Sequence, residues 1–202
     1  MLLHALRHAP SANFTYLIAD GAHGAVIDPS FQGQGVLRKA AQLGLTIDVV
    51  LLTHDHTDHC ADLERVALAS GCRVGAHPSS RIRKDIALED GATVRVGELA
   101  IRVIHTPGHT PDSVCLLADG CLFTGDTLFV GECGRTDLPG GDAAALYDSL
   151  FRVLGALDDK LGVYPGHDYG SQPHSTLGQE RRTSYVLRPR TLEDFVRFMA
   201  EP

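Results

Sequence analysis

The sequence of 202 residues has no tryptophan, and aromatic residues of all kinds make up only 6% of it. It is also short of positive charge, with 18 Lys and Arg against 25 Asp and Glu and a formal net charge of -7. Nucleic acids and anionic membranes attract basic proteins, so this balance disfavours both as partners. No apolar run has the length of a membrane span, and the opening residues are too polar for a signal peptide. We therefore expect a cytoplasmic protein.

Cysteine is scarce, and its spacing matches no recognised cross-link or redox pair. The cysteines form no CxxC motif and their number is odd: Cys60, Cys72, Cys115, Cys121 and Cys133. A chain of this length does not need disulfides to fold, so we expect reduced thiols. These thiols are the only support in the sequence for a third hypothesis, a non-catalytic metal-binding or redox-sensing protein.

Apolar residues, in contrast, are abundant. Hydrophobic residues make up 44% of the chain and charged residues 21%, which is typical of a globular protein. The length suits one domain with a substantial core. We therefore predict a single domain over residues 1–202.

Short apolar runs alternate with segments of helical periodicity along the chain. The runs predict strands at 14–18, 25–29, 49–52, 73–76 and 161–164, and hairpins at 93–104 and 114–124. Helical spacing predicts helices at 36–43, 61–69 and 144–154, the last capped by Asp142. Capping boxes predict two more helices, which begin at Thr176 and Thr191. Mixed strands and helices with hairpins and crossovers indicate a layered α/β fold.

Polar residues stand directly after several of the predicted strands. His54, His109, Asp126 and His167 each follow one, and glycine precedes Asp126 and His167. Strand ends that meet at one edge of a sheet are a usual place for a site. Glycine would let the backbone bend tightly beside a ligand. We expect these four segments to converge.

The densest cluster of titratable side chains lies in residues 54–59, which read His-Asp-His-Thr-Asp-His. Imidazoles and carboxylates cost free energy to bury unless a partner compensates them, and a divalent cation is such a partner. Neutral imidazole with carboxylate suits zinc, iron or manganese. The alternative is a solvated polar loop that happens to be rich in histidine. That alternative does not explain why His109, Asp126 and His167 also follow strands.

Residues 54–59 resemble the HxHxDH motif of the metallo-β-lactamase superfamily. The resemblance implies a four-layered αββα sandwich. It also implies two metal positions. The first ion would be held by His54, His56 and His109, the second by Asp58, His59 and His167, and Asp126 would bridge them.

A longer resemblance, to the persulfide dioxygenase branch of that superfamily, runs along nearly the whole chain. The matching segments are residues 13–17, 88–91, 106–111, 123–126, 133–137 and 164–169, with a tail that extends from 175 to 196. That branch uses one ferrous ion per chain, and the implied ligands are His54, His109 and Asp126. Two imidazoles and one carboxylate on one face leave positions for O₂ and substrate. The implied reaction oxidises a small persulfide, such as glutathione persulfide, to sulfite and a thiol.

The same motifs contain candidate residues for catalysis and substrate binding. Asp58, Arg135 and Tyr169 are the candidate catalytic residues, and Arg135, Tyr169 and Arg181 are the candidates for contact with the substrate. For Arg181, the alternative is an exposed face of its helix. With a single bound ion, the remaining histidines and Asp58 would orient the ligands. A homodimer is an option that the resemblance allows.

A second hypothesis is a hydroxyacylglutathione hydrolase of the glyoxalase II type. There, one or two zinc ions would activate water against a glutathione thioester, and Asp58 would be a ligand. Longer members of that type carry a further helical domain, whereas this chain ends at Pro202, so we expect the dioxygenase. The stretch Ser184-Tyr185-Val186-Leu187 replaces the Asn-Pro-Arg-Leu that is common in the dioxygenase branch. The sequence therefore leaves the thiol carrier open.

Overall fold

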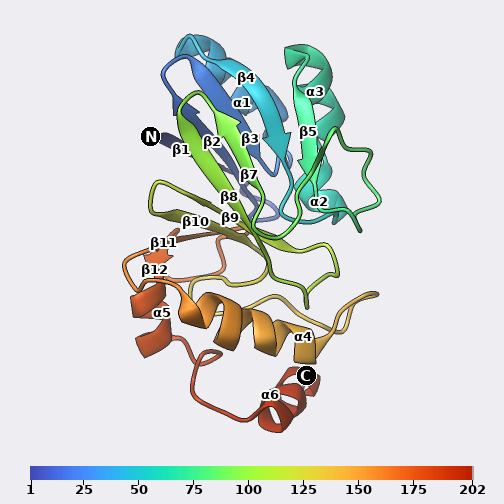
Figure 1. Cartoon of the computed structure of the whole chain (residues 1–202), viewed down its shortest axis with the longest axis vertical. Coiled ribbons are helices and arrows are strands. Elements are labelled where there is room, and N and C mark those ends of the chain that lie inside the picture. Colours follow the sequence, from blue (N-terminus) through green and yellow to red (C-terminus); the bar gives the residue numbers. More distant parts are fainter. Residues whose placement is uncertain (202) are drawn as a thin grey trace.

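The structure is a computed structural model that describes residues 1–201. Within this range the strands form two six-stranded sheets (Figure 1). The first sheet has the order β1 (Leu2–Arg7), β2 (Phe14–Asp20), β3 (His23–Ile27), β4 (Thr46–Leu51), β5 (Arg73–Ala76) and β6 (Ile86–Ala87). The second has the order β12 (Ser175–Thr176), β11 (Gly162–Pro165), β10 (Cys121–Gly125), β9 (Val114–Ala118), β8 (Leu99–His105) and β7 (Thr93–Val96).

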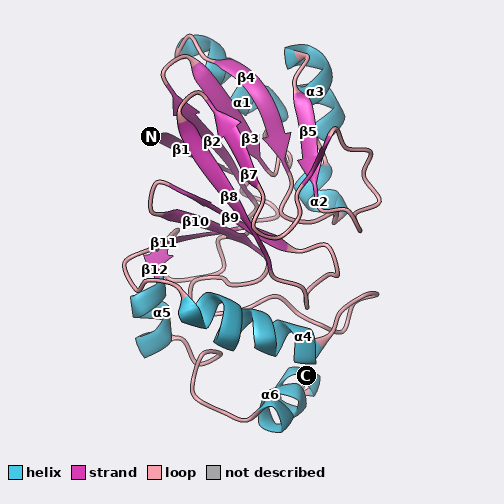
Figure 2. Cartoon of the chain, in the orientation of Figure 1, coloured by secondary structure: helices cyan, strands magenta, loops and turns pink. Residues whose placement is uncertain are grey.

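Helices cover the outer face of each sheet, as Figure 2 shows. The helices beside the first sheet are α1 (Gly33–Gln42), α2 (Thr57–Cys60) and α3 (Leu63–Ser70), and those beside the second are α4 (Ala143–Tyr147), α5 (Leu177–Thr183) and α6 (Leu192–Ala200). The predicted four-layered αββα sandwich is therefore confirmed. Over residues 1–201, none of the helices combines the length and the apolar character that crossing a bilayer requires.

The core between the two sheets is apolar and fully buried. Phe14 and Tyr16 of β2 pack in one cluster with Leu116 of β9 and Phe123 of β10. The Tyr16 hydroxyl also donates a hydrogen bond to the carbonyl oxygen of Pro165 in β11, at 2.6 Å. Because β2 and β11 belong to different sheets, this bond links the two halves of the sandwich.

The predicted strands and hairpins are confirmed, with small differences at their ends. The predicted caps are confirmed as well. The Asp142 carboxylate accepts hydrogen bonds from the backbone of α4, and the Thr176 and Thr191 hydroxyls accept from Gln179 N and Asp194 N. Local capping chemistry therefore places the ends of these helices as the sequence predicts.

Two features of the fold differ from the sequence-based expectation. The helix predicted at 144–154 is not a single α-helix, because α4 ends at Tyr147 and the chain widens into a π-helical segment, Asp148–Val153, and a 3-10 turn, Leu154–Ala156. The strand β1 was not predicted at all. It lies at the edge of its sheet, and all its side chains are exposed or half-buried, so it lacks the apolar alternation that marks a strand.

We expect the change Phe123→Ala to lower the free energy of unfolding by about 3–5 kcal/mol, because it opens a cavity in the core. Phe123 is fully buried between Tyr16 and Tyr164, with ring centroids 5.0 and 5.5 Å away. Urea unfolding followed by circular dichroism measures the effect. The control Leu68→Ala, at a side chain that is 77% exposed, should stay within about 0.5 kcal/mol of the parent protein. Equal losses for the two variants would contradict the assignment of the core.

Candidate metal centre

Loops from both sheets meet at one edge of the sandwich. His54 follows β4 of the first sheet, whereas His109 follows β8, Asp126 follows β10 and His167 follows β11 of the second. The structure brings these four segments together, as expected from their places after strands. The cluster is complete only when the two sheets are packed against each other.

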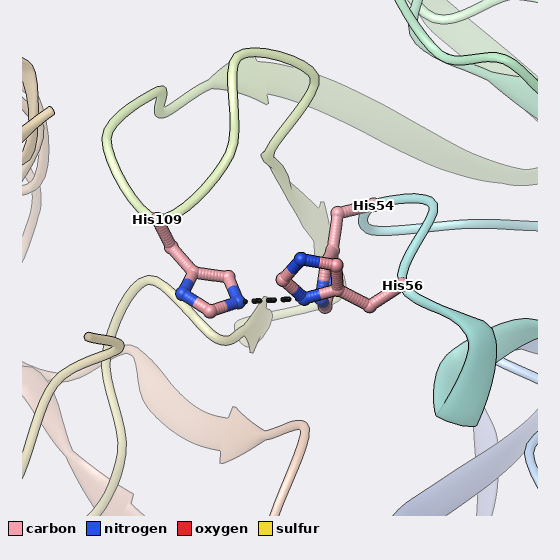
Figure 3. Close-up of side chains that lie close together, drawn as sticks. All are labelled: His54, His56 and His109. Atoms are coloured by element: carbon pink, nitrogen blue, oxygen red, sulfur yellow. Dashed lines mark hydrogen bonds between the residues drawn. The ribbon is translucent and has the colours of Figure 1, made fainter. Parts of the chain in front are cut away.

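Three histidines form one group of metal-ligating atoms (Figure 3). His56 Nδ1 lies 3.1 Å from His54 Nε2 and 2.9 Å from His109 Nε2. Ligand atoms from the three side chains all lie within 4.8 Å of one another, which is the spacing of ligands around a single ion.

Asp126 joins this group to a second one. Its Oδ2 lies 3.6 Å from His109 Nε2 and 3.5 Å from His167 Nε2, and its Oδ1 lies 3.3 Å from His59 Nε2. Asp58 completes the second group, with its Oδ2 3.4 Å from His167 Nε2. All the residues that the sequence suggests as ligands are therefore clustered: His54, His56, Asp58, His59, His109, Asp126 and His167.

The donor set fits a bound divalent cation. His59 Nε2 and His167 Nε2 face each other at 3.2 Å. In a hydrogen bond between two imidazoles, one ring donates its N–H and only the other uses its lone pair. A cation between them accepts a lone pair from both rings. Asp126 is 8% exposed, and its Oδ1 accepts no well-aligned hydrogen bond from any residue between 1 and 201. A buried carboxylate oxygen without a donor is costly, and a metal ion would remove that cost.

The histidines of the cluster divide into two protonation classes. Burial lowers the pKa of His54 well below its ordinary value, and the charge on His59 adds to the effect. Burial also lowers the pKa of His59, but the nearby carboxylates, chiefly Asp126, outweigh it and raise that pKa well above its ordinary value. The pKa of His167 rises to about 9 against the effect of burial, because carboxylates accept its hydrogen bonds. Without a metal, His54 is neutral and offers a lone pair to a cation, whereas His59 and His167 hold protons that a cation must displace.

Asp28 orients one side of the cluster, and the sequence analysis missed it. Its carboxylate accepts hydrogen bonds from Thr53 N at 2.8 Å and from Thr53 Oγ1 at 2.6 Å. Its Oδ2 also lies 3.0 Å from His59 Nδ1, which leaves His59 Nε2 directed at Asp126. Asp28 directly follows β3, as Asp126 follows β10, but the predicted strand at 25–29 included it and so hid this signal.

Two other hydrogen bonds fix ligands from outside the cluster. Asn13 Nδ2 donates to Asp58 Oδ2 at 2.9 Å. His109 Nδ1 donates to the Arg135 carbonyl oxygen at 2.8 Å, so its Nε2 is the nitrogen that faces the other ligands. Such bonds set the tautomer and the ring orientation of a metal-binding histidine. Asn13 lies in a segment that the sequence analysis singled out, but its role required the fold.

Glycine permits the close packing of the ligands at two positions. Gly125 has a φ of 49°, and a Cβ there would lie 2.5 Å from Thr53 Oγ1. A Cβ at Gly166 would lie 2.4 Å from Asp126 Oδ1. A side chain at either position would displace a ligand or its support, which explains why glycine precedes Asp126 and His167.

A cavity of about 490 Å³ opens over the cluster. Its lining combines five of the ligands with a wall of other residues: Phe129, Glu132, Cys133, Gly134, Arg135, Leu138 and Tyr169. The Tyr169 ring stacks on His167, with centroids 4.6 Å apart and planes within 9°. The volume suits a small molecule or part of a larger one.

The sequence also matches a known protein family. The pattern of the metallo-beta-lactamase superfamily matches residues 9–81 and 76–167. The chain belongs to the metallo-β-lactamase superfamily. The resemblance carried by residues 54–59 is therefore confirmed.

Relatives within the superfamily include a hydroxyacylglutathione hydrolase and persulfide dioxygenases. A hydroxyacylglutathione hydrolase of Anaeromyxobacter dehalogenans is 43% identical over 161 residues, which cover 79% of this chain and 62% of the relative. The mitochondrial persulfide dioxygenase ETHE1 of Homo sapiens is 33% identical over 208 residues, which cover 98% of this chain and 80% of the relative. The crystal structure of ETHE1 from Myxococcus xanthus has a TM-score of 0.94 and 36% identity, and the match covers 100% of this chain and 92% of that one. The chain thus spans less than two thirds of the hydrolase relative.

The predicted substrate-binding residues lie in different places. Arg135 and Tyr169 line the cavity over the metal cluster. Arg181 does not line it. The Arg181 guanidinium pairs with Asp159 and donates to the carbonyl oxygens of Leu154, Gly155 and Leu157. Those carbonyls end a helical segment and need donors, so the contacts give Arg181 a structural role.

Cys133 and Cys115 lack the lowered thiol pKa that is typical of a redox sensor. Cys133 lines the cavity, but burial raises the pKa of its thiol to about 12, and the charge on Glu132 adds to the effect. Burial likewise raises the pKa of the Cys115 thiol to about 11. Reactive sensor thiols have lowered pKa values, so these shifts weigh against the redox-sensing hypothesis.

We expect a first Zn²⁺ ion to bind with weak pH dependence and a second ion with strong pH dependence. The first group contains neutral His54, whereas a second ion must displace protons from His59 and His167. The pKa of His167 is about 9 and that of His59 is also raised, so affinity for the second ion falls as the pH drops through the range in which these groups take up protons, by about tenfold per pH unit for each proton displaced. Calorimetric titration of metal-free protein at several pH values measures both steps. Equal slopes for the two ions would contradict this assignment, and Asp28→Asn should flatten the second slope.

Proposed function

We propose that this protein is a persulfide dioxygenase with one ferrous ion per chain, held by His54, His109 and Asp126. The observation that carries the proposal is the extent of the likeness to persulfide dioxygenases. It covers 98% of this chain in the human relative and 100% in the Myxococcus xanthus structure, and so includes α5 and α6. The match to the hydroxyacylglutathione hydrolase of Anaeromyxobacter dehalogenans has higher identity but covers 79% of the chain. Two imidazoles and a carboxylate are also the ligand set of non-haem iron oxygenases.

The proposed reaction converts a persulfide, O₂ and water into a thiol, sulfite and two protons. The terminal sulfur is oxidised by four electrons, and O₂ is reduced by the same four. When bound, the ferrous ion would supply O₂ chemistry at coordination positions that the three protein ligands leave open. The protein itself must place the terminal sulfur over the ligand cluster and take up the protons that the reaction releases.

Asp58 is the group best placed to accept a proton. It lines the cavity, and hydrogen bonds from His167 and Asn13, together with the charge on His59, lower its pKa although burial opposes them. A carboxylate held ionised beside the substrate can take up the persulfide proton in transit, and its lowered pKa means that it releases that proton again to solvent. His167, whose Nε2 lies 3.4 Å away and already holds a proton, keeps this carboxylate ionised.

Tyr169 and Arg135 would hold the substrate at the mouth of the cavity. Tyr169 is 57% exposed and forms a wall with Phe129, whose ring lies edge-on at 5.3 Å. This aromatic wall would shield the reacting sulfur from water. The Arg135 guanidinium donates two hydrogen bonds to Asp137 and has further N–H groups for a substrate oxygen. The substrate would be a small thiol derivative. A cytoplasmic location stays a prediction, and the human relative is named as mitochondrial.

Iron-loaded protein is expected to consume O₂ with glutathione persulfide and to form one sulfite per O₂. An oxygen electrode and a sulfite assay measure the two quantities. Asp126→Asn should lose bound iron and activity together, because it removes the carboxylate shared by both ligand groups. The control Asp48→Asn removes the same charge from a surface pair with His23 and should leave both unchanged. If the iron-loaded parent protein consumes no O₂ with any low-molecular-weight persulfide, the proposed function is wrong.

One observation favours a second function, the hydrolysis of a glutathione thioester. Asp58, His59 and His167 form a complete second ligand group beside Asp126, and two bridged ions would activate water for attack on a thioester. The 43% identity to a hydroxyacylglutathione hydrolase agrees with this reading.

Under the hydrolase alternative, protein loaded with two zinc ions per chain is expected to release thiol from S-lactoylglutathione. The change His167→Ala should lower kcat by about a hundredfold or more, because it removes a ligand of the second ion. Dithiobisnitrobenzoate absorbance follows the thiol. Absence of turnover at full double occupancy would exclude the hydrolase.

A further inference from the structure

The metal cavity shares a wall with a second cavity of about 590 Å³. Glu132, Cys133 and Arg135 line both. The second cavity continues toward α6, over Val186, Phe198 and Met199. A molecule whose sulfur lies at the metal ligands would extend past Glu132 into this second space.

The shared wall carries one uncompensated charge, the Glu132 carboxylate. Arg135 is the only lysine or arginine among residues 1–201 that lines either cavity, and both oxygens of Asp137 bind its guanidinium at 2.5 Å. Glu132 Oε2 accepts a hydrogen bond from the Tyr185 hydroxyl at 2.5 Å, but that partner is neutral. The passage between the cavities is therefore acidic.

The backbone around Glu132 is held firmly. Its carbonyl oxygen accepts from Phe129 N at 2.8 Å, and Leu128 pairs with Cys133 across the turn. Within the turn, Gly131 N donates to the buried Glu180 carboxylate at 2.7 Å. A charge on such a fixed loop is preorganised for a ligand.

The Arg190 guanidinium lies near Glu132 but contacts other groups. The Arg190 guanidinium lies over the Phe198 ring, 4.3 Å from its centroid, and donates to the carbonyl oxygens of Tyr185 and Arg188. It does not line either cavity within the described chain. The charge on Arg190 acts on Cys133 and Tyr185, but within residues 1–201 the Glu132 carboxylate forms no ion pair and stays available to a cationic ligand.

We propose that Glu132 binds an ammonium group on the thiol carrier, so that the protein selects carriers that bear a primary amine. Val186, Phe198 and Met199 would contact the carbon chain of the carrier beyond that amine. The proposal rests on the proposed function only in taking the substrate to be a thiol derivative. It applies to either reaction, because it concerns the carrier and not the reacting sulfur.

Two matched pairs of persulfides test this selection. Glutathione is compared with N-acetylglutathione, which lacks the ammonium, and cysteamine with 3-mercaptopropionate, which replaces ammonium by carboxylate on a carbon chain of similar length. We expect kcat/KM to favour the amine-bearing member of at least one pair by about tenfold, the effect of one charge-assisted hydrogen bond. Glu132→Gln should reduce that preference to about twofold or less. Tyr185→Phe, which frees the carboxylate from its neutral partner, should keep the preference.

The control Glu89→Gln removes the same charge at an exposed position outside both cavities and should leave the ratio unchanged. If iron-loaded protein oxidises none of the persulfides, the proposed function fails, and the same pairs are then tested as free thiols that bind zinc-loaded protein, by calorimetry. Equal affinities or rates within both pairs, a preference for the carboxylate, or an unchanged ratio in Glu132→Gln would each overturn the role of Glu132. The activity assay therefore tests the proposed function, and the ratio between carriers tests the role of Glu132 independently.

Discussion

The fold depends on how seven imidazole and carboxylate groups share one small volume. Ligand nitrogens of neighbouring histidines approach to about 3 Å, so each pair sets like groups, either lone pairs or N–H groups, against one another unless a single proton or a cation lies between them. Asp126 bears most of this conflict, because it contacts histidines of both groups and keeps one buried oxygen without a well-aligned donor within residues 1–201. A divalent cation converts this repulsion into coordination. The surrounding hydrogen bonds, from His59 Nδ1 to the Asp28 carboxylate and from His109 Nδ1 to the Arg135 carbonyl oxygen, hold that arrangement in place.

The two proposed chemistries differ in how many of the ligand groups hold an ion, and those two groups differ in charge state. The first contains a histidine that burial keeps neutral, and the second contains histidines that carboxylates keep protonated. Occupancy of the second group therefore depends on proton release as well as on metal supply. The wall formed by Tyr169 and Glu132 is common to both chemistries, so carrier recognition is separable from the reaction at sulfur.

The sequence predicted the parts of the molecule whose signals are local. Strand ends followed by His or Asp, capping residues such as Thr176, and the density of residues 54–59 each carry their meaning within a few positions. Asp28 and Asn13 were missed as supports because their partners, His59 and Asp58, lie more than 30 positions away. Long-range contacts of that kind follow from topology, which a single sequence states only indirectly.

Other parts could not be read from the sequence for different reasons. The sequence around Arg181 is the same whether its side chain contacts a substrate or the carbonyl oxygens at the end of a helical segment. Only the fold shows which groups the side chain contacts. Glu132 acquires its position from a turn that is pinned by the distant Glu180. The edge strand β1 gains its structure from pairing with β2 and not from its own apolar pattern.

The hydrogen bond from Tyr16 to Pro165 has a consequence for how the protein matures in the cell. It ties the strand next to the N-terminal edge to the strand that ends beside His167, and no complete pair of ligand groups exists before that closure. A nascent chain on the ribosome therefore cannot assemble both groups until its last quarter has emerged. Capture of an ion by the group that contains Asp58, His59 and His167 would then mark completed folding.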